Sequence, residues 1–232
     1  MREVIFEIGH NHNGNLDLAK LMIEEVKACG GTVAKFQLYD TDKIKKSWQS
    51  RYLELKMAEL SKEDVWELKK HCDKVGVEFF ASAFDIERVG WLEEMGVKRH
   101  KIASRSIYDQ DLIKAMEKTG KSIIASLGSW KEAGLPQIKN AQYLFCISEY
   151  PTYITPNQFP HEFSVEGYAG FSDHSIGTYW AREAFKRGAI IVEKHFTLSN
   201  QLPGFNQKGS MEPWEAKDLV SYKNQIERGI TF

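Results

Sequence analysis

Phe171-Ser172-Asp173-His174 and Val192-Glu193-Lys194-His195-Phe196-Thr197 are the two stretches that decide the fold and indicate where its functional site lies. Each sets a histidine beside an acidic residue at what is expected to be the end of a β-strand. The two histidines are 21 positions apart (195 − 174), about the span of one strand-to-strand repeat that includes a helix. In a parallel sheet or barrel, both imidazoles would lie at the same rim on neighbouring strands.

Two imidazoles near carboxylates at an open rim suit a divalent metal that keeps free coordination positions. A single histidine is more often a satisfied polar or core residue, so the prediction depends on the matched pair. We therefore expect His174 and His195 to bind a metal or to act in catalysis.

The composition excludes several classes of protein. A chain of 232 residues can bury a full core, and its formal net charge of −1, without a long run of one sign, argues against nucleic acid or anionic membrane as a partner. The N-terminal stretch is too short and too charged for a signal peptide, and no window reaches the apolar length of a membrane span. We expect a cytoplasmic protein whose Cys29, Cys72 and Cys146 are reduced core thiols.

Short apolar runs alternate with amphipathic helices, and the helix boundaries are marked by their residues. Helix starts are expected at Asn15, Ser61, Asp85 and Ser129, where Ser61 and Ser129 each begin a capping-box pattern. Helix ends are expected at glycines, which favour the left-handed conformation found there: Gly30, Gly76, Gly96, Gly120 and Gly188. The expected strands are 4–8, 32–37, 77–82, 99–103, 122–126, 142–147, 168–172 and 189–193.

Eight alternating strand and helix units in one chain favour a (β/α)8 TIM barrel, an α/β fold, as a single domain over residues 1–232. An open doubly wound sheet is the alternative, but no Gly-x-Gly-x-x-Gly turn follows the first strand. Residues 38–60 are the longest insertion and are expected to close over the mouth of the barrel, and residues 212–228 should form the last helix.

Polar residues gather at the expected carboxyl ends of the strands, where barrels of this type carry catalytic groups. Residues two apart on a strand share a face, so Glu193 and His195, for example, can both point inward. Lysines and hydroxyls can surround a phosphate or carboxylate, whereas glutamates offer acid or base chemistry. The alternatives are lysines that extend to solvent, glutamates that only pair with them, and a His12 that orients the first loop. The strand-end residues are Glu7, Lys35, Gln37, Ser82, Lys101, Ser104, Ser126, Tyr150, Ser172, His174, Glu193 and His195.

These residues resemble the sialic acid synthases, the family of N-acetylneuraminate synthase. The resemblance covers nearly the whole chain, in the family's order and spacing. Its segments are Glu7-Ile8-Gly9-x-Asn11-His12-Asn13-Gly14, Lys35-Phe36-Gln37, Phe84-Asp85, Lys101-Ile102-Ala103-Ser104, Tyr150-Pro151-Thr152, Ser172-Asp173-His174, Glu193-Lys194-His195-Phe196-Thr197 and Leu202-Pro203-Gly204.

The resemblance implies a barrel that condenses phosphoenolpyruvate with an open-chain aldose to a 2-keto-3-deoxy sugar acid and phosphate. It implies a divalent metal on His174 and His195, usually Mn²⁺, with Mg²⁺ or Co²⁺ as alternatives. Glu7 would be catalytic, and Gln37 and Tyr150 would lie toward the sugar; a catalytic role for Glu193 is expected from its position at the strand end. The residues implied to contact phosphoenolpyruvate are Lys35, Ser82, Lys101, Ser104, Ser126 and Ser172.

The chain departs from the family at the sugar end. Ser106 stands where the family has an acid, and Asn206 and Gln207 replace an acid that holds the sugar and its neighbouring histidine. The C-terminal antifreeze-like domain, which normally reaches a partner subunit's active site, is absent from the sequence given. We expect a rebuilt sugar site at Asn206 that does not prefer N-acetylmannosamine, and a homo-oligomer or a separate chain that supplies the missing domain.

Two other functions stay open on the sequence. A Schiff-base aldolase is the enzymatic alternative, because Lys35, Lys101 and Lys194 lie on expected strands. A barrel that binds a sugar or phosphate ligand without turnover is the other, motivated by Ser106 and the missing domain.

Overall fold

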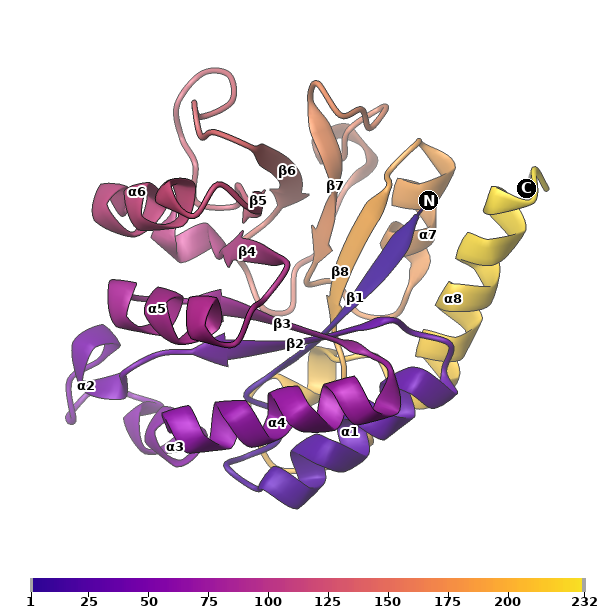
Figure 1. Cartoon of the computed structure of the whole chain (residues 1–232). Coiled ribbons are helices and arrows are strands. Elements are labelled where there is room, and N and C mark those ends of the chain that lie inside the picture. Colours follow the sequence, from indigo (N-terminus) through magenta and orange to yellow (C-terminus); the bar gives the residue numbers. More distant parts are fainter. Residues whose placement is uncertain (1, 231–232) are drawn as a thin grey trace.

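The computed structural model, which describes residues 2–230, is a closed barrel of eight parallel strands surrounded by helices (Figure 1). Neighbouring strands follow the order of the sequence, and the first strand pairs with the eighth to close the barrel. The predicted (β/α)8 fold is therefore confirmed. The strands are β1 (Glu3–Gly9), β2 (Val33–Leu38), β3 (Glu78–Ala83), β4 (Arg99–Ile102), β5 (Ser122–Ser126), β6 (Ala141–Cys146), β7 (Tyr168–Asp173) and β8 (Ile191–His195).

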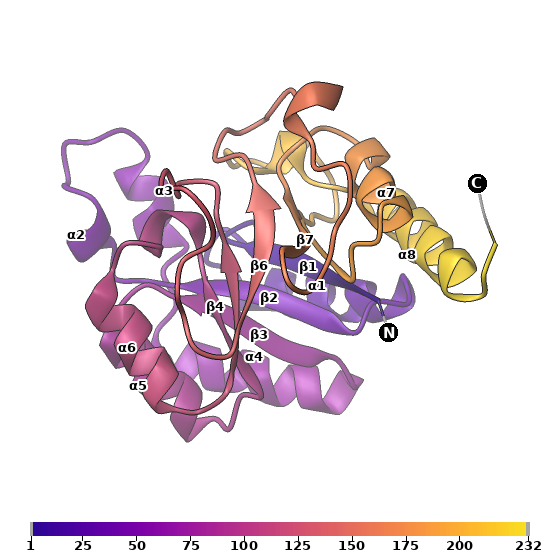
Figure 2. The ribbon, with the colours of Figure 1, turned by 90° about the horizontal axis from the view of Figure 1, so that it is seen from above.

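The helices pack in pairs on the outside of the barrel. In both ribbon views, α5 and α6 lie together on one side and α7 and α8 on the other (Figures 1 and 2). The longer helices α1 and α4 pack against each other beneath β2 and β3. The helices are α1 (Leu16–Ala28), α2 (Thr41–Ile44), α3 (Tyr52–Met57), α4 (Lys62–Val75), α5 (Ile86–Glu94), α6 (Gln110–Lys118), α7 (Tyr179–Lys186) and α8 (Pro213–Glu227).

Helix α4 shows why these segments begin and end where the sequence predicts. The Ser61 side chain accepts a hydrogen bond from the Asp64 N–H, and the Asp64 carboxylate accepts one from the Ser61 N–H. The helix ends at Gly76, whose φ of 76° lies in the left-handed region that glycine adopts without strain. The predicted N-caps of α1 and α5 are confirmed at Asn15 and Asp85.

The helix predicted after Ser129 is wrong. Residues 127–140, between β5 and β6, form turns and irregular loop, and the β6–β7 connection holds only a short 3₁₀ helix, Pro156–Gln158. Gly134 (φ 75°) and Pro136 interrupt the helical pattern within one turn or two of its start. The Trp130 indole instead donates to the Gly134 carbonyl oxygen at 2.9 Å and stacks on Tyr108. The capping-box pattern there consequently has no helix to cap.

The barrel interior changes from apolar to polar along the strands. Six buried side chains fill a layer inside the barrel: Ile5, Val33, Phe80, Ile124, Leu144 and Ile191. Because side chains alternate across a strand, the residue two positions further on faces the interior again. On these six strands that residue is Glu7, Lys35, Ser82, Ser126, Cys146 and Glu193. The strands thus place a polar layer directly above an apolar one, and a second, larger apolar core lies between strands and helices.

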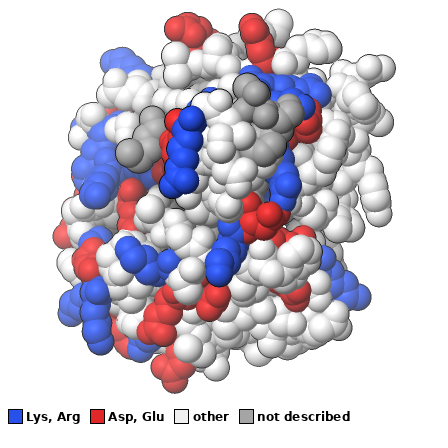
Figure 3. Space-filling model, turned by 90° about the vertical axis from the view of Figure 1, so that its right-hand side faces the viewer, with Lys and Arg blue, Asp and Glu red and all other residues white. Residues whose placement is uncertain are grey.

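The outer surface is mixed in charge. On the side face in Figure 3, lysine and arginine side chains are interspersed with aspartate and glutamate. This agrees with the formal net charge of −1. Within residues 2–230, no helix combines the length and the apolar character needed to cross a membrane.

Candidate active site

A polar pocket, here called the inner site, opens at the carboxyl ends of the strands. Strand pairing explains its geometry, because Glu7 lies opposite both Lys35 on β2 and His195 on β8. Ser82 and Lys101 are likewise paired between β3 and β4. The pocket contains every predicted site residue except Asn206: Glu7, Lys35, Gln37, Ser82, Lys101, Ser104, Ser126, Tyr150, Ser172, His174, Glu193 and His195.

Two lysines and two glutamates form a buried ionic cluster in the inner site. Lys35 Nζ contacts Glu7 Oε2 and lies 3.5 Å from Glu193 Oε2, while Lys101 Nζ lies 3.7 Å from Glu193 Oε1. All four side chains are at most 8% exposed, so neither lysine extends to solvent. Hydroxyl groups complete the cluster: Lys101 donates to Ser126 Oγ at 2.7 Å, Lys35 to Ser82 Oγ at 3.2 Å, and Ser172 to Glu193 Oε1 at 3.0 Å.

The surroundings shift the pKa values of the two glutamates in opposite directions. Burial raises the pKa of Glu7, and the nearby Glu193 adds to the shift against the opposing Lys35. Burial also disfavours the Glu193 carboxylate, but the ammonium groups of Lys101 and Lys35 hold its pKa below the ordinary value. Neighbouring carboxyl groups whose pKa values are pushed apart can serve as an acid and a base.

The two lysines also differ. Burial lowers the pKa of Lys101, which lies within 4 Å of a single carboxylate. Burial acts in the same direction on Lys35, but Glu193 and Glu7 together raise the pKa of that lysine above its usual value. The inner site therefore holds one firmly charged lysine and one whose charge is less favoured.

His174 and His195 face each other with 6.0 Å between their ring centroids. His174 Nδ1 lies 2.8 Å from the Ile147 carbonyl oxygen, an acceptor only, so this nitrogen carries the proton. The other nitrogen, Nε2, is then left to accept a hydrogen bond from the Tyr150 hydroxyl at 2.7 Å. Burial lowers the pKa of His195 well below its usual range and keeps that imidazole neutral.

The two imidazoles fit a metal ion with open coordination positions. With ring centroids 6.0 Å apart, both imidazoles could bind one cation, for which His174 Nε2 would have to exchange its contact with the Tyr150 hydroxyl. His174 is oriented by a backbone carbonyl in the way that metal-binding histidines usually are. No group of three or more His, Cys, Asp or Glu side chains in residues 2–230 is arranged to hold a metal. Water or substrate would have to complete the coordination of an ion held here.

Cys146 is a residue of the inner site that the sequence analysis placed in the core. Its thiol is buried and unpaired as predicted, but it lines the pocket with Sγ 3.9 Å from His174 Nδ1. Although burial opposes ionisation, the neighbouring His174 lowers the pKa of this thiol. Cys146 lies two positions after the inward-facing Leu144, and this spacing was the signal that could have identified it.

A second hollow of about 370 Å³, here called the outer cavity, adjoins the inner site and shares Gln37, Ser104 and Tyr150 with it. As expected of the insertion 38–60, five of its residues contribute to the wall. The remaining wall comes from the loops after several strands. The lining residues are His10, Gln37, Tyr39, Ile44, Lys45, Arg51, Leu55, Phe84, Ala103, Ser104, Arg105, Ser129, Ser148, Tyr150 and Asn206.

Of His12, Asn206 and Gln207, only Asn206 lines one of the cavities described. It lines both the outer cavity and a further hollow of about 490 Å³ beside the two histidines. Gln207 is buried and donates to the Asn11 carbonyl oxygen at 2.9 Å, so it fixes the loop. His12 is also buried and accepts a hydrogen bond from the Gly14 N–H, which favours its role in orienting the first loop. Lys194 points away from the inner site and pairs with Asp173 at 3.0 Å.

A closed (β/α)8 barrel with buried lysines, glutamates and paired histidines at the carboxyl ends of its strands has the layout of a barrel enzyme. The family model named NeuB matches residues 22–231. The chain therefore belongs to the NeuB family, the family of the sialic acid synthases, and is a carbon–carbon bond-forming synthase.

Several relatives carry names of this kind. The N,N'-diacetyllegionaminic acid synthase of Campylobacter jejuni is 32% identical over 98% of this chain and 77% of the relative. The human N-acetylneuraminate-9-phosphate synthase is 29% identical over 98% of this chain and 70% of the relative. The crystal structure of the N-acetylneuraminic acid synthetase of Leptospira borgpetersenii in complex with citrate matches with a TM-score of 0.87 and 30% identity, covering 98% of this chain and 84% of that one.

Proposed function

We propose that this enzyme condenses phosphoenolpyruvate with an open-chain aldose and releases a 2-keto-3-deoxy sugar acid and phosphate. The single observation that carries the proposal is the buried cluster of Lys35, Lys101, Glu7 and Glu193 beside two histidines. Phosphoenolpyruvate has a carboxylate and a phosphate on neighbouring atoms. The ammonium groups of Lys35 and Lys101, with serine hydroxyls beside them, suit such a compact anion, although Glu7 and Glu193 offset part of their charge.

In the proposed reaction, carbon 3 of phosphoenolpyruvate forms a bond to the aldehyde carbon, and the aldehyde oxygen takes up a proton. Water adds at carbon 2 and loses a proton to give a hydroxyl group. The bond from carbon 2 to the phosphate oxygen then breaks, and the hydroxyl proton passes to the departing phosphate to leave a ketone. Glu7, whose pKa is raised by burial, suits the donor of the first proton. Glu193, which stays ionised between two lysines, suits the acceptor of the second.

Positioning would supply much of the rate. Lys35 extends from β2 and Lys101 from β4, and each donates a hydrogen bond to a serine hydroxyl, Lys35 to Ser82 and Lys101 to Ser126. Donors fixed before substrate arrives need no reorganisation during the reaction. Gln37 and Tyr150, at the boundary of the two cavities, are placed to contact the aldose.

His174 and His195 would hold the divalent metal, for which the resemblance to the sialic acid synthases implies Mn²⁺, with Mg²⁺ or Co²⁺ as alternatives. A bound metal of this kind polarises a carbonyl group. A His174→Ala, His195→Ala double variant should lose Mn²⁺ binding in calorimetry. Unchanged tight binding of Mn²⁺ by that variant would assign the metal elsewhere.

The proposed function is tested by phosphate release from phosphoenolpyruvate and Mn²⁺ across a panel of aldoses. At least one aldose should give stoichiometric phosphate and a 2-keto acid. If no aldose releases phosphate although phosphoenolpyruvate binds, the chain is a binding barrel and the proposal fails.

One observation favours a Schiff-base aldolase as a second candidate. Burial lowers the pKa of Lys101, and a neutral amine is what attack on a ketone requires. Lys194 does not suit this role, because it is buried outside the inner site and paired with Asp173. Borohydride in the presence of pyruvate should leave the chain unmodified under the synthase proposal. A stable pyruvate adduct on Lys101 would favour the aldolase.

A further inference from the structure

The outer cavity is lined by an excess of positive charge, and the residues that carry this charge do not line the inner site. Lys45, Arg51 and Arg105 line it, and among its lining residues in the described chain none is acidic. Arg51 lies 3.4 Å from Glu54 Oε2, just outside the wall. The side chains of Lys45 and Arg105 make no ion pair with any residue of 2–230. One carboxylate therefore faces three cations around a hollow large enough for part of a sugar.

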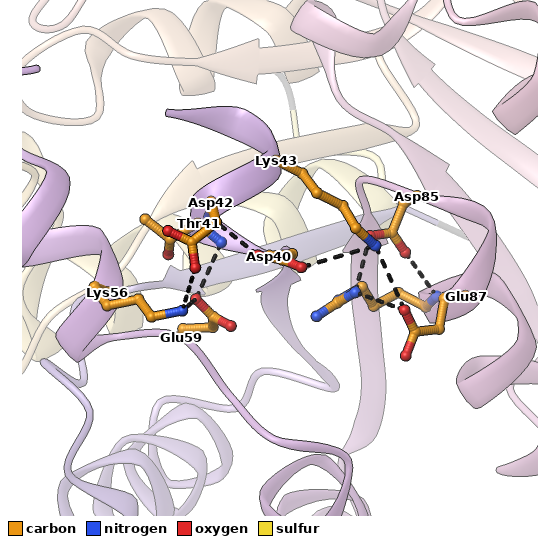
Figure 4. A network of polar contacts seen from close by, with 9 residues as sticks. Asp40, Thr41, Asp42, Lys43, Lys56, Glu59, Asp85 and Glu87 are labelled. Atoms are coloured by element: carbon orange, nitrogen blue, oxygen red, sulfur yellow. Dashed lines mark hydrogen bonds and ion pairs between the residues drawn. The ribbon is translucent and has the colours of Figure 1, made fainter. Parts of the chain in front are cut away.

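Other cations of the same insertion are neutralised. Lys43 and Lys56 lie within a few residues of Lys45 and Arg51, and both point into a network of carboxylates (Figure 4). Their partners, at 3.0–3.8 Å, are Asp40, Asp85 and Glu87 for Lys43, and Asp42 and Glu59 for Lys56. Lys45 and Arg51 face the cavity instead; Lys45 has no ion pair within residues 2–230 and Arg51 has a single carboxylate partner, Glu54.

Arg51 is held in place before any ligand binds. Its φ of 67° lies in the left-handed region, which non-glycine residues adopt at an energetic cost. Its guanidinium lies over the Phe205 ring at 3.7 Å, and the Phe205 N–H donates to Glu54 at 2.9 Å. These contacts join the insertion to the loop after β8 across the mouth of the barrel. A strained backbone locked by neighbours is typical of a residue that positions a ligand.

We propose that the outer cavity binds the far end of the acceptor aldose and that this end carries an anionic group, a phosphate ester or a carboxylate. The inference rests on the proposed function, because it assigns the second substrate of that reaction. Gln37 and Tyr150 contact both cavities and would connect the reacting aldehyde to the anionic end. Lys45, Arg51 and Arg105 then determine specificity rather than catalysis, since they lie away from Lys35 and Lys101.

The test uses three acceptors that differ only at carbon 6: N-acetylmannosamine, its 6-phosphate and its 6-carboxylate. With phosphoenolpyruvate and Mn²⁺ present, an anionic acceptor should exceed the neutral sugar in kcat/KM by about tenfold or more, the factor that one modest charge-assisted contact provides. Preference for the 6-phosphate over the 6-carboxylate would identify the anion as a phosphate ester, and the reverse as a carboxylate.

Matched variants assign the preference to residues. Arg105→Gln and Lys45→Gln should each lower the preference for the anion roughly tenfold and leave KM for phosphoenolpyruvate unchanged. Lys46→Gln is the control, because Lys46 is exposed on the same segment, carries the same charge and does not line the cavity. A neutral acceptor that is used as well as both anions overturns the inference. A rise in KM for phosphoenolpyruvate in Arg105→Gln, without a change in acceptor preference, overturns it as well.

Failure of the proposed reaction can be separated from failure of this inference by calorimetry without turnover. N-acetylmannosamine 6-phosphate should bind the wild type more tightly than N-acetylmannosamine does, and more tightly at low than at high salt. Arg105→Gln should remove this difference. Equal affinity of the two sugars for the wild type counts against the cavity assignment even if some neutral aldose releases phosphate.

Discussion

The inner site and the outer cavity adjoin each other but hold their charges in opposite ways. In the inner site, Lys35 and Lys101 stand on strands, are buried and face carboxylates. In the outer cavity, Lys45 and Arg105 stand on connecting segments and have no acidic partner within residues 2–230. The strands thus provide lysines and glutamates that neutralise one another in a fixed geometry, whereas the loops provide positive charges without acidic partners. Under the proposed function, the strand-borne cluster would carry the chemistry and the loop-borne cations would select the acceptor.

The largest expected effect is that of Lys101→Ala, which removes one of the two lysines of the inner site. The substitution removes a buried cation from Glu193 and Ser126, so the affinity for phosphoenolpyruvate should fall by about 2 kcal/mol or more, at least roughly 30-fold. Calorimetric titration with phosphoenolpyruvate measures the loss. Lys186→Ala removes an exposed lysine from α7 and serves as the control. Equal affinity in wild type and Lys101→Ala would remove Lys101 from the binding site.

This difference between strands and loops also explains what could be predicted from the sequence. Glu7, Lys35 and Ser82 each follow an apolar inward residue by two positions, and strand periodicity alone places them at one rim. The prediction of secondary structure failed in a loop, where side chains follow no regular strand or helix periodicity. The segment after Ser129 has a capping pattern but no helix, because Gly134 and Pro136 intervene.

The outer cavity could not be predicted for the same physical reason. Lys45, Arg51 and Arg105 come from two segments far apart in the sequence, and their meeting depends on long-range contacts. One such contact stacks Arg51 on Phe205. Lys43 and Lys45 have the same charge and nearly the same place in the sequence, yet Lys43 is paired with acids and Lys45 lines the cavity. Composition cannot separate two such residues.

Gly128→Ala would disturb the boundary between the two cavities. A Cβ at this position would lie 2.4 Å from Ser148 Oγ, 2.9 Å from Cys146 Sγ and 3.0 Å from Ser104 Oγ. These short side chains must shift to make room, so we expect kcat/KM to fall about tenfold, the effect of misplacing a contact worth about 1.4 kcal/mol.

The control for this prediction is Gly90→Ala. Gly90 lies within α5, and a Cβ there would meet nothing within 4 Å. Alanine should stabilise the helix by about 0.5–1 kcal/mol and leave kcat/KM unchanged. If Gly128→Ala has the activity of the wild type, the serine hydroxyls around it are not fixed parts of the boundary.

The smallest expected effect is on the pH dependence of the free energy of unfolding. It comes from the loop after β1, whose His10 lines the outer cavity. Burial lowers the pKa of His10 and of His12 to about 4, from the ordinary histidine value of 6.5. In the unfolded chain these two histidines become protonated near pH 6.5. In the folded chain they become protonated only near pH 4. The stability contributed by each neutral histidine is therefore complete above pH 6.5 and is lost as the pH falls toward 4. Between pH 7 and 5 each histidine should lower the free energy of unfolding by about 1–2 kcal/mol.

Urea unfolding of the wild type and of His12→Gln at both pH values measures this loss, and His161→Gln, at an exposed histidine, is the control. The difference in unfolding free energy between the two pH values should shrink in His12→Gln and stay unchanged in His161→Gln. An unaltered difference in His12→Gln would mean that His12 does not resist protonation in the folded protein.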